Sequence, residues 1–420
     1  MHKMVSYPNG LRLIMKKLDF LRSVSVGVWV GAGSAYEDSQ INGISHFIEH
    51  MLFKGTTNRT AFDIADSIDK IGGQINAFTA KEITCYYTKS IDEHLEQCLD
   101  ILSDMLFNSL FDEKELEKEK KVVLEEISMT EDSPEDVCHE HLAKLFFEGS
   151  PLGQPIIGNA DNINSFNKEK IQKFMADHYC PQNIVIAVAG NLDFDKLTDM
   201  VDKYFNQRFQ GRENCLKAVP APKHLSAHKF GSKVKQLEQA SIAIGFPSPV
   251  FNSEDTHAMM IMSNILGGSM SSRLFQKIRE ELGLAYSVYS FISSYKNNGL
   301  FSIYCGTNPQ NIEKAVSTTV EELKKFVKDG ITDDEFLRGK EQLKGNFILG
   351  QENTTAIMNV YGKMLLVSDE IFDLDKKLKD INSITKDDVI NVARKYLNFE
   401  RASIACVANR ETEDLLKYIN

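Results

Sequence analysis

Apolar residues recur along the chain with the spacing of both strands and helices. Residues 184–191 and 402–409 are short apolar runs of the kind that form buried strands. Residues 44–52 repeat apolar side chains with helical spacing, between Asn42-Gly43, which can open a helix, and Lys54-Gly55, which can close one. We therefore expect a helix here, with one buried face formed by Ile44, Phe47, Ile48, Met51 and Leu52.

A second helix is predicted over residues 112–129. Asp112 followed by Glu115 is a typical helix start, and residues 115–127 contain neither Gly nor Pro. Glu119 and Glu126 are seven positions apart, about two turns, so they share one face. Four apolar residues surround Glu126. We therefore predict that this stretch is substantially buried and that the Glu126 carboxylate needs a cation as partner. A solvated acidic helix is the alternative, and it fits residues 113–119 better than Glu126.

The pattern of the first half returns in the second. The strand at residues 184–191 matches the one at 402–409, a shift of 218 positions (402 minus 184), and residues 24–29 match 240–245. We predict two related domains, 1–207 and 236–420, joined by a polar, Pro-containing and Lys-rich linker at 208–235. Because strands and helices do not alternate regularly, the predicted class is α+β, each half a mostly antiparallel sheet packed against helices.

Composition narrows the classes of function. The net charge of the 420 residues is −11 and no basic stripe is present, which argues against nucleic acid as a partner. No run of eighteen apolar residues predicts a membrane span, and the N-terminus lacks the apolar stretch of a signal peptide. Seven scattered cysteines without a C-x-x-C pattern favour reduced thiols. A cytoplasmic bacterial protein is the expectation, with the mitochondrial matrix less favoured.

Candidate metal chemistry lies in the first predicted helix, at His46-Phe47-Ile48-Glu49-His50. Positions four apart share a helix face, so His46 and His50 can offer two imidazoles to one zinc ion, with Glu49 beside them. Such a site needs a third protein ligand and leaves its fourth position to water. The candidates are the glutamates of residues 112–129. Two surface histidines that share a helix with a glutamate are the alternative.

Residues 46–56 resemble the signature of the pitrilysin-type zinc peptidases, in particular the β-subunit of mitochondrial processing peptidase and its bacterial relatives. The resemblance implies that Glu126, 76 positions beyond His50, is the third ligand of one zinc ion per chain, and that Glu119 supports the site. It also implies a substrate-binding region, in which an exposed strand edge holds the peptide. That region comprises Phe53, Asn76, Ala77, Phe78 and Thr79.

The same resemblance extends to the second half. It implies that Arg279 and Tyr286, seven apart, reach the active site and donate hydrogen bonds to the developing oxyanion. The alternative is that Arg279 pairs with Glu280 while Tyr286 packs in a strand. In the second half Met259, Met262 and Ser263 stand in place of the metal motif, and Asn346 in place of the third ligand. His257 lies nearby, and we expect it to be a surface or interface residue.

The same resemblance also implies a cleavage specificity and an oligomeric assembly. Asp136 and Glu140, ten and fourteen positions beyond Glu126, would favour an arginine just before the cleaved bond, although a solvated acidic face is an equal alternative. The neighbouring His139 and His141 are expected at the surface. A homodimer enclosing unfolded peptides is the expected assembly, and a heterodimer remains open.

Together these observations predict a zinc metalloendopeptidase in which Glu49 is the general base and extended peptides are hydrolysed inside a closed chamber. The competing predictions are a non-catalytic core or assembly subunit of the same fold, and a peptide-binding protein that retains zinc for structure.

Overall fold

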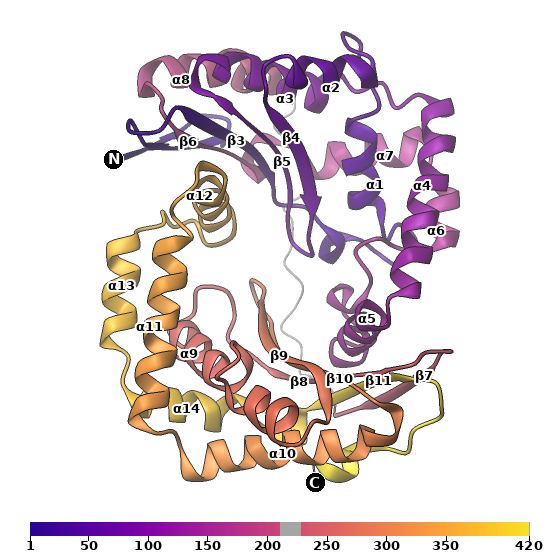
Figure 1. The fold of residues 1–420 in the computed structure, drawn as a ribbon. Helices are drawn as coiled ribbons and strands as arrows, with labels where there is room; N and C mark the ends of the chain where they lie inside the picture. Colours follow the sequence, from indigo (N-terminus) through magenta and orange to yellow (C-terminus); the bar gives the residue numbers. More distant parts are fainter. Residues whose placement is uncertain (211–227, 420) are drawn as a thin grey trace. The chain divides into compact units, whose positions relative to one another are not determined.

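The computed structural model describes residues 1–210 and 228–419 (Figure 1). Most of the predicted linker, residues 211–227, therefore lies outside the described residues. Its end does not remain a linker, because Phe230–Val234 forms a strand, β7. The described chain packs as two compact units. The first contains residues 1–127, 155–210 and 349–372, and the second contains residues 128–154, 228–348 and 373–419.

A six-stranded sheet organises the first unit, in the order β1-β2-β6-β3-β5-β4. Only β2 and β6 pair in parallel, and β4 is an edge strand that pairs with β5 alone. The strands are β1 (His2–Ser6), β2 (Arg12–Lys17), β3 (Ser23–Val30), β4 (Gln74–Thr79), β5 (Thr84–Ile91) and β6 (Ile184–Gly190).

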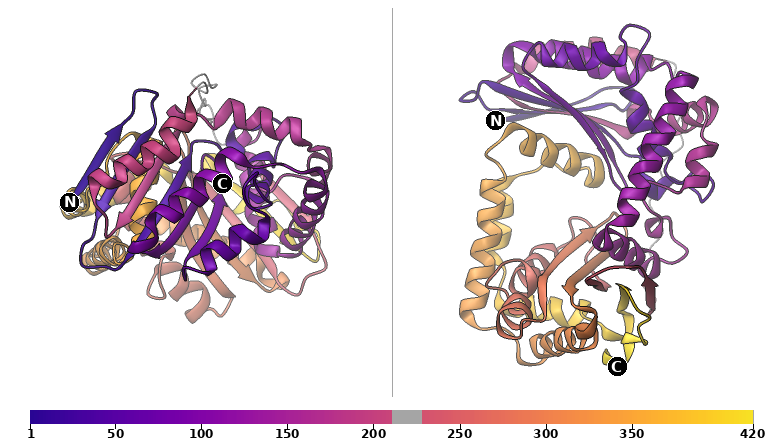
Figure 2. Two further views of the ribbon diagram at one scale, coloured as in Figure 1. Left: turned by 90° about the horizontal axis from the view of Figure 1, so that it is seen from above. Right: turned by 45° about the vertical axis from the view of Figure 1, so that its right-hand side comes forward.

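Helices cover both faces of this sheet. In Figures 1 and 2, α3 and α8 lie on one face and α12 lies against the other. The helices of the first unit are α1 (Ile44–Leu52), α2 (Ala61–Asp69), α3 (Leu95–Asn108), α6 (Ala160–Ser165), α7 (Lys168–His178), α8 (Phe194–Val201) and α12 (Thr354–Ser368). To these is added α4 (Glu113–Asp132), most of which lies in this unit.

The second unit repeats the plan with a five-stranded sheet, in the order β7-β11-β8-β10-β9. Only β7 and β11 pair in parallel, and β9 forms an edge. Its remaining strands are β8 (Ala240–Pro247), β9 (Ala285–Ser294), β10 (Gly299–Thr307) and β11 (Ser403–Ala408). Its helices are α5 (Pro134–Phe146), α9 (Thr256–Gly267), α10 (Ile312–Asp329), α11 (Asp333–Leu349), α13 (Leu374–Ser383) and α14 (Lys386–Tyr396). The predicted fold class is confirmed: two related units, each with a mostly antiparallel sheet on helices.

The two units exchange one helix each. Although α5 comes from the first half of the sequence, it packs on β8 and β11; α12 comes from the second half and packs on β3 and β6. The helix α12 comes close to β3 because a glycine lies on each side of the contact, Gly27 on β3 and Gly362 on α12. A Cβ at Gly27 would lie 2.3 Å from Met358 Sδ, and one at Gly362 would lie 2.3 Å from Trp29 Nε1. The boundaries drawn from the sequence did not include this exchange.

The central strand β3 shows why both faces of the sheet need a cover. Its alternate valines, such as Val26 and Val28, belong to the main core of the unit. On the opposite face, the Ser25 hydroxyl lies 2.9 Å from Thr354 Oγ1 and the Trp29 indole donates to Met358 Sδ at 3.3 Å, both from α12. Residues of both faces of β3 are thus buried.

The cysteines only partly follow the expectation of reduced thiols. Five are free and buried, namely Cys85, Cys98, Cys138, Cys305 and Cys406. Cys180, however, is disulfide-bonded, so the prediction is wrong at that position. Among the described residues, no helix has the length and the apolar character that a membrane crossing requires.

Candidate metal centre

Helix α1 is fixed at its first turn by a buried carboxylate. Glu37, 1 % exposed, accepts hydrogen bonds from the backbone N–H of Gly43 at 2.7 Å and of Ser45 at 2.8 Å. These N–H groups have no partner within the helix, so the carboxylate both satisfies them and complements the helix dipole. Gly43 has φ 99°, and a Cβ there would lie 2.8 Å from the Gly158 Cα. The start of the motif helix is therefore set by contacts outside the motif.

The structure brings the three predicted ligands together. His46 and His50 project from α1 with ring centroids 4.6 Å apart, and Glu126 projects from α4. The Glu126 Oε2 atom lies 3.8 Å from His46 Nε2 and 3.5 Å from His50 Nε2. Within the described residues, this is the one group of three such side chains whose ligand atoms all lie within 4.8 Å of one another.

This donor set fits zinc. Zinc–nitrogen and zinc–oxygen bonds are about 2.0–2.2 Å, so two donors of a tetrahedral site lie about 3.3–3.5 Å apart. Two imidazole nitrogens and one carboxylate oxygen at 3.5 and 3.8 Å need only a small adjustment to reach that spacing. Three protein ligands also leave a fourth position open, which is the pattern of catalytic rather than structural zinc sites.

Glu119 fixes the tautomer of His50. Its buried carboxylate accepts from His50 Nδ1 at 2.9 Å and from the Lys54 ammonium at 2.7 Å. Burial raises the pKa of Glu119, but these two hydrogen bonds outweigh it and the net pKa is lowered. An ionised carboxylate only accepts, so the His50 proton lies on Nδ1 and the lone pair lies on Nε2, facing Glu126.

The two imidazoles lie in different environments. Burial, with the charge of His50, lowers the pKa of His46 to about 4, so this ring is neutral at pH 7 and ready to coordinate. Burial also lowers the pKa of His50, but the hydrogen bond to Glu119 and the surrounding carboxylates outweigh it, and the net pKa is raised. His46 Nδ1 is buried and has no hydrogen-bond partner among the described residues.

Glu49 lies half-buried on the same helix. Burial raises the pKa of its carboxyl, and a hydrogen bond from Thr79 Oγ1 to Oε2, 2.5 Å long, opposes that shift only in part. A raised pKa suits a group that must take up a proton and release it again.

The predicted substrate strand is β4, the exposed edge of the first sheet. The Asn76 side chain accepts from the Ala77 N–H at 2.8 Å, and Phe78 packs edge-on against Trp29 with ring centroids 5.6 Å apart. Phe53, which directly follows α1, is half-buried against the core of the unit. An edge position is what strand addition by a peptide requires.

In the second unit, Arg279 and Tyr286 contact each other. The Arg279 guanidinium lies 4.9 Å from the Tyr286 ring centroid and 4.7 Å from that of Phe275. Tyr286 is 75 % exposed near the start of β9, so the alternative of a packed strand residue does not fit it. Arg279 Nε also lies 3.6 Å from Glu280 Oε1, as the other alternative expected. Their role at the metal centre stays a prediction.

Asp136 and Glu140 lie exposed on α5. The two histidines beside Glu140 are not surface residues, contrary to expectation. His139 is half-buried, with Nε2 2.9 Å from the Tyr289 hydroxyl, and burial lowers the pKa of His141 to about 4. Both face the sheet of the second unit because α5 packs on it.

Helix α9 holds the second-half counterparts of the motif. Met259, Met262 and Ser263 are all buried in it, so the position of the metal site is filled by core packing. His257 was expected to be a surface or interface residue, and the surface alternative is wrong. His257 is only 8 % exposed, because its ring packs against Phe347 with centroids 6.1 Å apart.

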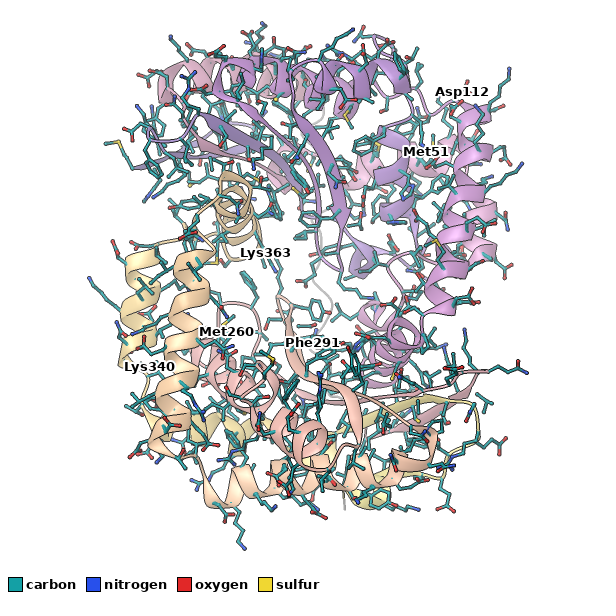
Figure 3. The ribbon with its side chains drawn as sticks, in the orientation of Figure 1. Met51, Asp112, Met260, Phe291, Lys340 and Lys363 are labelled. Carbon is teal, nitrogen blue, oxygen red and sulfur yellow. The ribbon has the colours of Figure 1, made fainter. Side chains whose placement is uncertain are left out.

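Sequence reasoning about α4 was right on its start and partly wrong on its burial. Asp112, labelled in Figure 3, caps the helix by accepting from the Lys114 N–H at 2.9 Å. Its buried residues are Leu116, Glu119 and Val123, whereas Val122 and Glu125 are exposed and Glu126 is only partly buried. The stretch of α4 around Glu126 is thus partly exposed to solvent and is not a segment of the core.

Two residues of the site were missed. Lys54 lies four positions beyond His50, so helical spacing offered a signal for its contact with Glu119. Glu37 carried no local signal, because its partners begin five residues later, with Asn42, and lie at the start of the next helix.

The comparisons with known proteins agree with this geometry. The family model "Insulinase (Peptidase family M16)" matches residues 12–160, and "Peptidase M16 inactive domain" matches residues 165–343. The chain belongs to peptidase family M16. The first family model covers His46, Glu49, His50 and Glu126, and the second begins at residue 165, still within the first unit, and runs on into the second.

Two curated relatives of this M16 protein come from bacteria. One from Bacillus subtilis, named uncharacterized zinc protease YmxG, is 43 % identical over 96 % of this chain and 97 % of its own length. Another uncharacterized zinc protease, from Streptomyces coelicolor, is 39 % identical over 95 % of this chain and 88 % of its own length.

Two solved structures share the fold. A protease from Helicobacter pylori has a TM-score of 0.90 at 24 % identity, over 97 % of this chain and 99 % of its own. A protein from Pseudomonas fluorescens, described as a peptidase M16 inactive domain, has a TM-score of 0.91 at 19 % identity and covers 99 % of both chains. At these identities the likeness concerns the fold alone.

Proposed function

We propose that this protein is a zinc-dependent endopeptidase that hydrolyses extended peptides. The observation that carries the proposal is the convergence of His46, His50 and Glu126, with Glu49 on the same helix as the two imidazoles. Membership of family M16 and relatives named zinc proteases support it.

The chain's own residues account for the remaining steps. Bound zinc supplies a Lewis acid that polarises the scissile carbonyl and acidifies water. Glu49 takes a proton from the attacking water and returns it to the leaving amine nitrogen. The edge of β4, through residues 76–79, holds the peptide as an added strand. Arg279 and Tyr286 donate to the developing oxyanion in this proposal.

The test compares wild type with Glu49→Gln, and uses Glu117→Gln, an exposed residue of α4, as a matched control. We expect wild type and both variants to bind one zinc per chain by atomic absorption. Glu49→Gln should lose cleavage of a quenched fluorescent peptide by at least about 100-fold, as loss of a general base does. Zinc binding without peptide turnover in wild type would refute the proposal and leave a peptide-binding or assembly protein.

Specificity for basic residues remains part of the proposal. Asp136 and Glu140 are both exposed on α5, and carboxylate pairs suit a guanidinium. Profiling of a peptide library should therefore show a preference for arginine near the cleaved bond that Asp136→Asn/Glu140→Gln removes. An identical cleavage profile for the double variant and wild type would refute the role of these two carboxylates in specificity.

The closed chamber and the homodimer, of the processing-peptidase β-subunit type, are also proposed. A homodimer should give twice the chain mass in light scattering. An extended peptide should be cleaved while a compact folded protein is spared. Equal cleavage of the two would contradict the chamber.

A further inference from the structure

We propose that Thr79 is a positioning residue for the general base: its hydroxyl holds one oxygen of Glu49, so that only the other oxygen can accept the proton from water. This inference rests on the proposed function. It gives Thr79, the last residue of the edge strand β4, a role besides contact with the peptide backbone.

The hydrogen bond itself fixes the direction of donation. Thr79 Oγ1 lies 2.5 Å from Glu49 Oε2, and a carboxylate only accepts, so the threonine hydroxyl donates its single proton to Oε2. The neighbouring Thr84 hydroxyl donates to the Ala32 carbonyl at 2.9 Å and lies 3.5 Å from Thr79 Oγ1. The better acceptor of the Thr79 proton is therefore Glu49.

The position of Thr79 is rigid because the turn after it is tied down. The Ala80 N–H donates to the Ile83 carbonyl at 2.8 Å, and the Ala35 N–H donates to the Lys81 carbonyl at 2.7 Å. Gly33 lies so close to this turn that a Cβ there would be 2.2 Å from the Ala80 carbonyl oxygen. The backbone of the turn thus packs directly on the segment that begins at Gly33.

The same segment also fixes the helix that carries Glu49. Four residues after Gly33, Glu37 accepts from the N–H groups of Gly43 and Ser45 at the start of α1. One short stretch of chain, residues 33–45, therefore holds both partners of the Thr79–Glu49 hydrogen bond. The backbone positions of Thr79 and of the helix that carries Glu49 are therefore fixed relative to each other.

The two oxygens of the Glu49 carboxylate consequently have different roles. With Oε2 engaged, Oε1 is the atom that takes the proton as the O–H bond of water breaks and the water oxygen joins the carbonyl carbon. The same proton then passes from Oε1 to the amine nitrogen as the C–N bond breaks. Loss of the Thr79 hydroxyl should let the carboxylate rotate and should slow the chemical step without weakening peptide binding.

The experiment uses Thr79→Val, which removes only the hydroxyl, and Thr79→Ser, which keeps it. Thr88→Val is the matched control, because Thr88 is fully buried on the adjacent strand β5 and its hydroxyl has no partner among the described residues. We expect kcat of Thr79→Val to fall about 10–100-fold, with KM and zinc content within about twofold of wild type. Thr79→Ser should keep kcat within about threefold, and Thr88→Val should equal wild type.

A second readout does not depend on turnover. Crystal structures of the zinc-free proteins should show the Glu49 carboxylate in one orientation in wild type and Thr79→Ser, and displaced or in several orientations in Thr79→Val. An unchanged kcat for Thr79→Val, or a raised KM with unchanged kcat, would overturn the positioning role. Wild type that binds zinc but cleaves no peptide would overturn the proposed function, and this role with it.

Discussion

The support of His50 by Glu119 yields a graded prediction for zinc affinity. Glu119 is 3 % exposed and accepts from both His50 Nδ1 and Lys54 Nζ. His50 and Lys54 bond different oxygens of Glu119, and in Glu119→Gln one of these oxygens becomes an N–H₂ group, so the amide can keep only one of the two hydrogen bonds. Lys54 is partly exposed and can turn to water, whereas the His50 ring is held in the site. We therefore expect the amide oxygen to stay with His50 and the loss to be moderate.

The magnitude follows from what each substitution removes. Partners that orient a metal-bound histidine are worth about 10–100-fold in affinity, which is about 1.4–2.7 kcal/mol. Glu119→Gln keeps a neutral acceptor for His50, so zinc affinity should fall about tenfold. Glu119→Ala removes the acceptor entirely, so affinity should fall about 100-fold.

The assay is a competition between the protein and a zinc-binding dye at pH 7.5, with folding checked by circular dichroism at the same temperature. Glu117→Gln is the control, because Glu117 lies exposed on the same helix and its ion pair within the described residues is with Lys120, away from His50. Equal affinities for wild type and Glu119→Ala, with both proteins folded, would refute the argument. An equal loss in Glu117→Gln would assign the effect to general charge instead.

Three further predictions concern stability. Glu37→Gln places an amide N–H₂ against donors at the start of α1, so urea unfolding should show a loss of about 1–3 kcal/mol. The Arg273 guanidinium and the Thr332 backbone outweigh burial and hold the pKa of Glu335 at about 2. The contribution of the Glu335–Arg273 pair to the free energy of unfolding should be complete above about pH 4.5 and lost as pH falls through 2. In zinc-free protein, Glu335→Gln should remove this contribution, which is about 1–2 kcal/mol after solvent screening. Met358→Ala should cost about 2–5 kcal/mol and shift the fluorescence of Trp29, the single tryptophan, to longer wavelength.

Elements with strong local periodicity were predictable. The apolar stripe of residues 44–52 gives α1 with its predicted bounds, and Asp112 caps α4 one residue before the helix begins. The sequence repeat at a shift of 218 reappears as two corresponding strands, β6 in the first sheet and β11 in the second, which begin at residues 184 and 403. In each case the signal lies within a few residues of the element it specifies.

Long-range packing was not predictable in the same way. The exchange of α5 and α12 depends on which sheet face each helix covers, and that choice is made by residues such as Gly27 and Gly362, more than 300 positions apart. The burial of His139 has the same origin, because it follows from the contact of α5 with the second sheet. A lone histidine in an acidic sequence gives no sign of such a partner.

Among the described residues the candidate metal ligands lie on α1 and α4 alone, and the contrast between α1 and α9 gives the physical reason. At corresponding positions α9 places Met259, Met262 and Ser263 in the core, which stabilises the unit by burying apolar surface. In α1 the equivalent face carries two partly buried imidazoles, whose Nε2 atoms face the Glu126 carboxylate. Such groups reduce stability unless a ligand compensates them. Packing alone would favour apolar residues at these positions, as in the second half. The first half instead retains the two imidazoles, which Glu119 and Glu37 support.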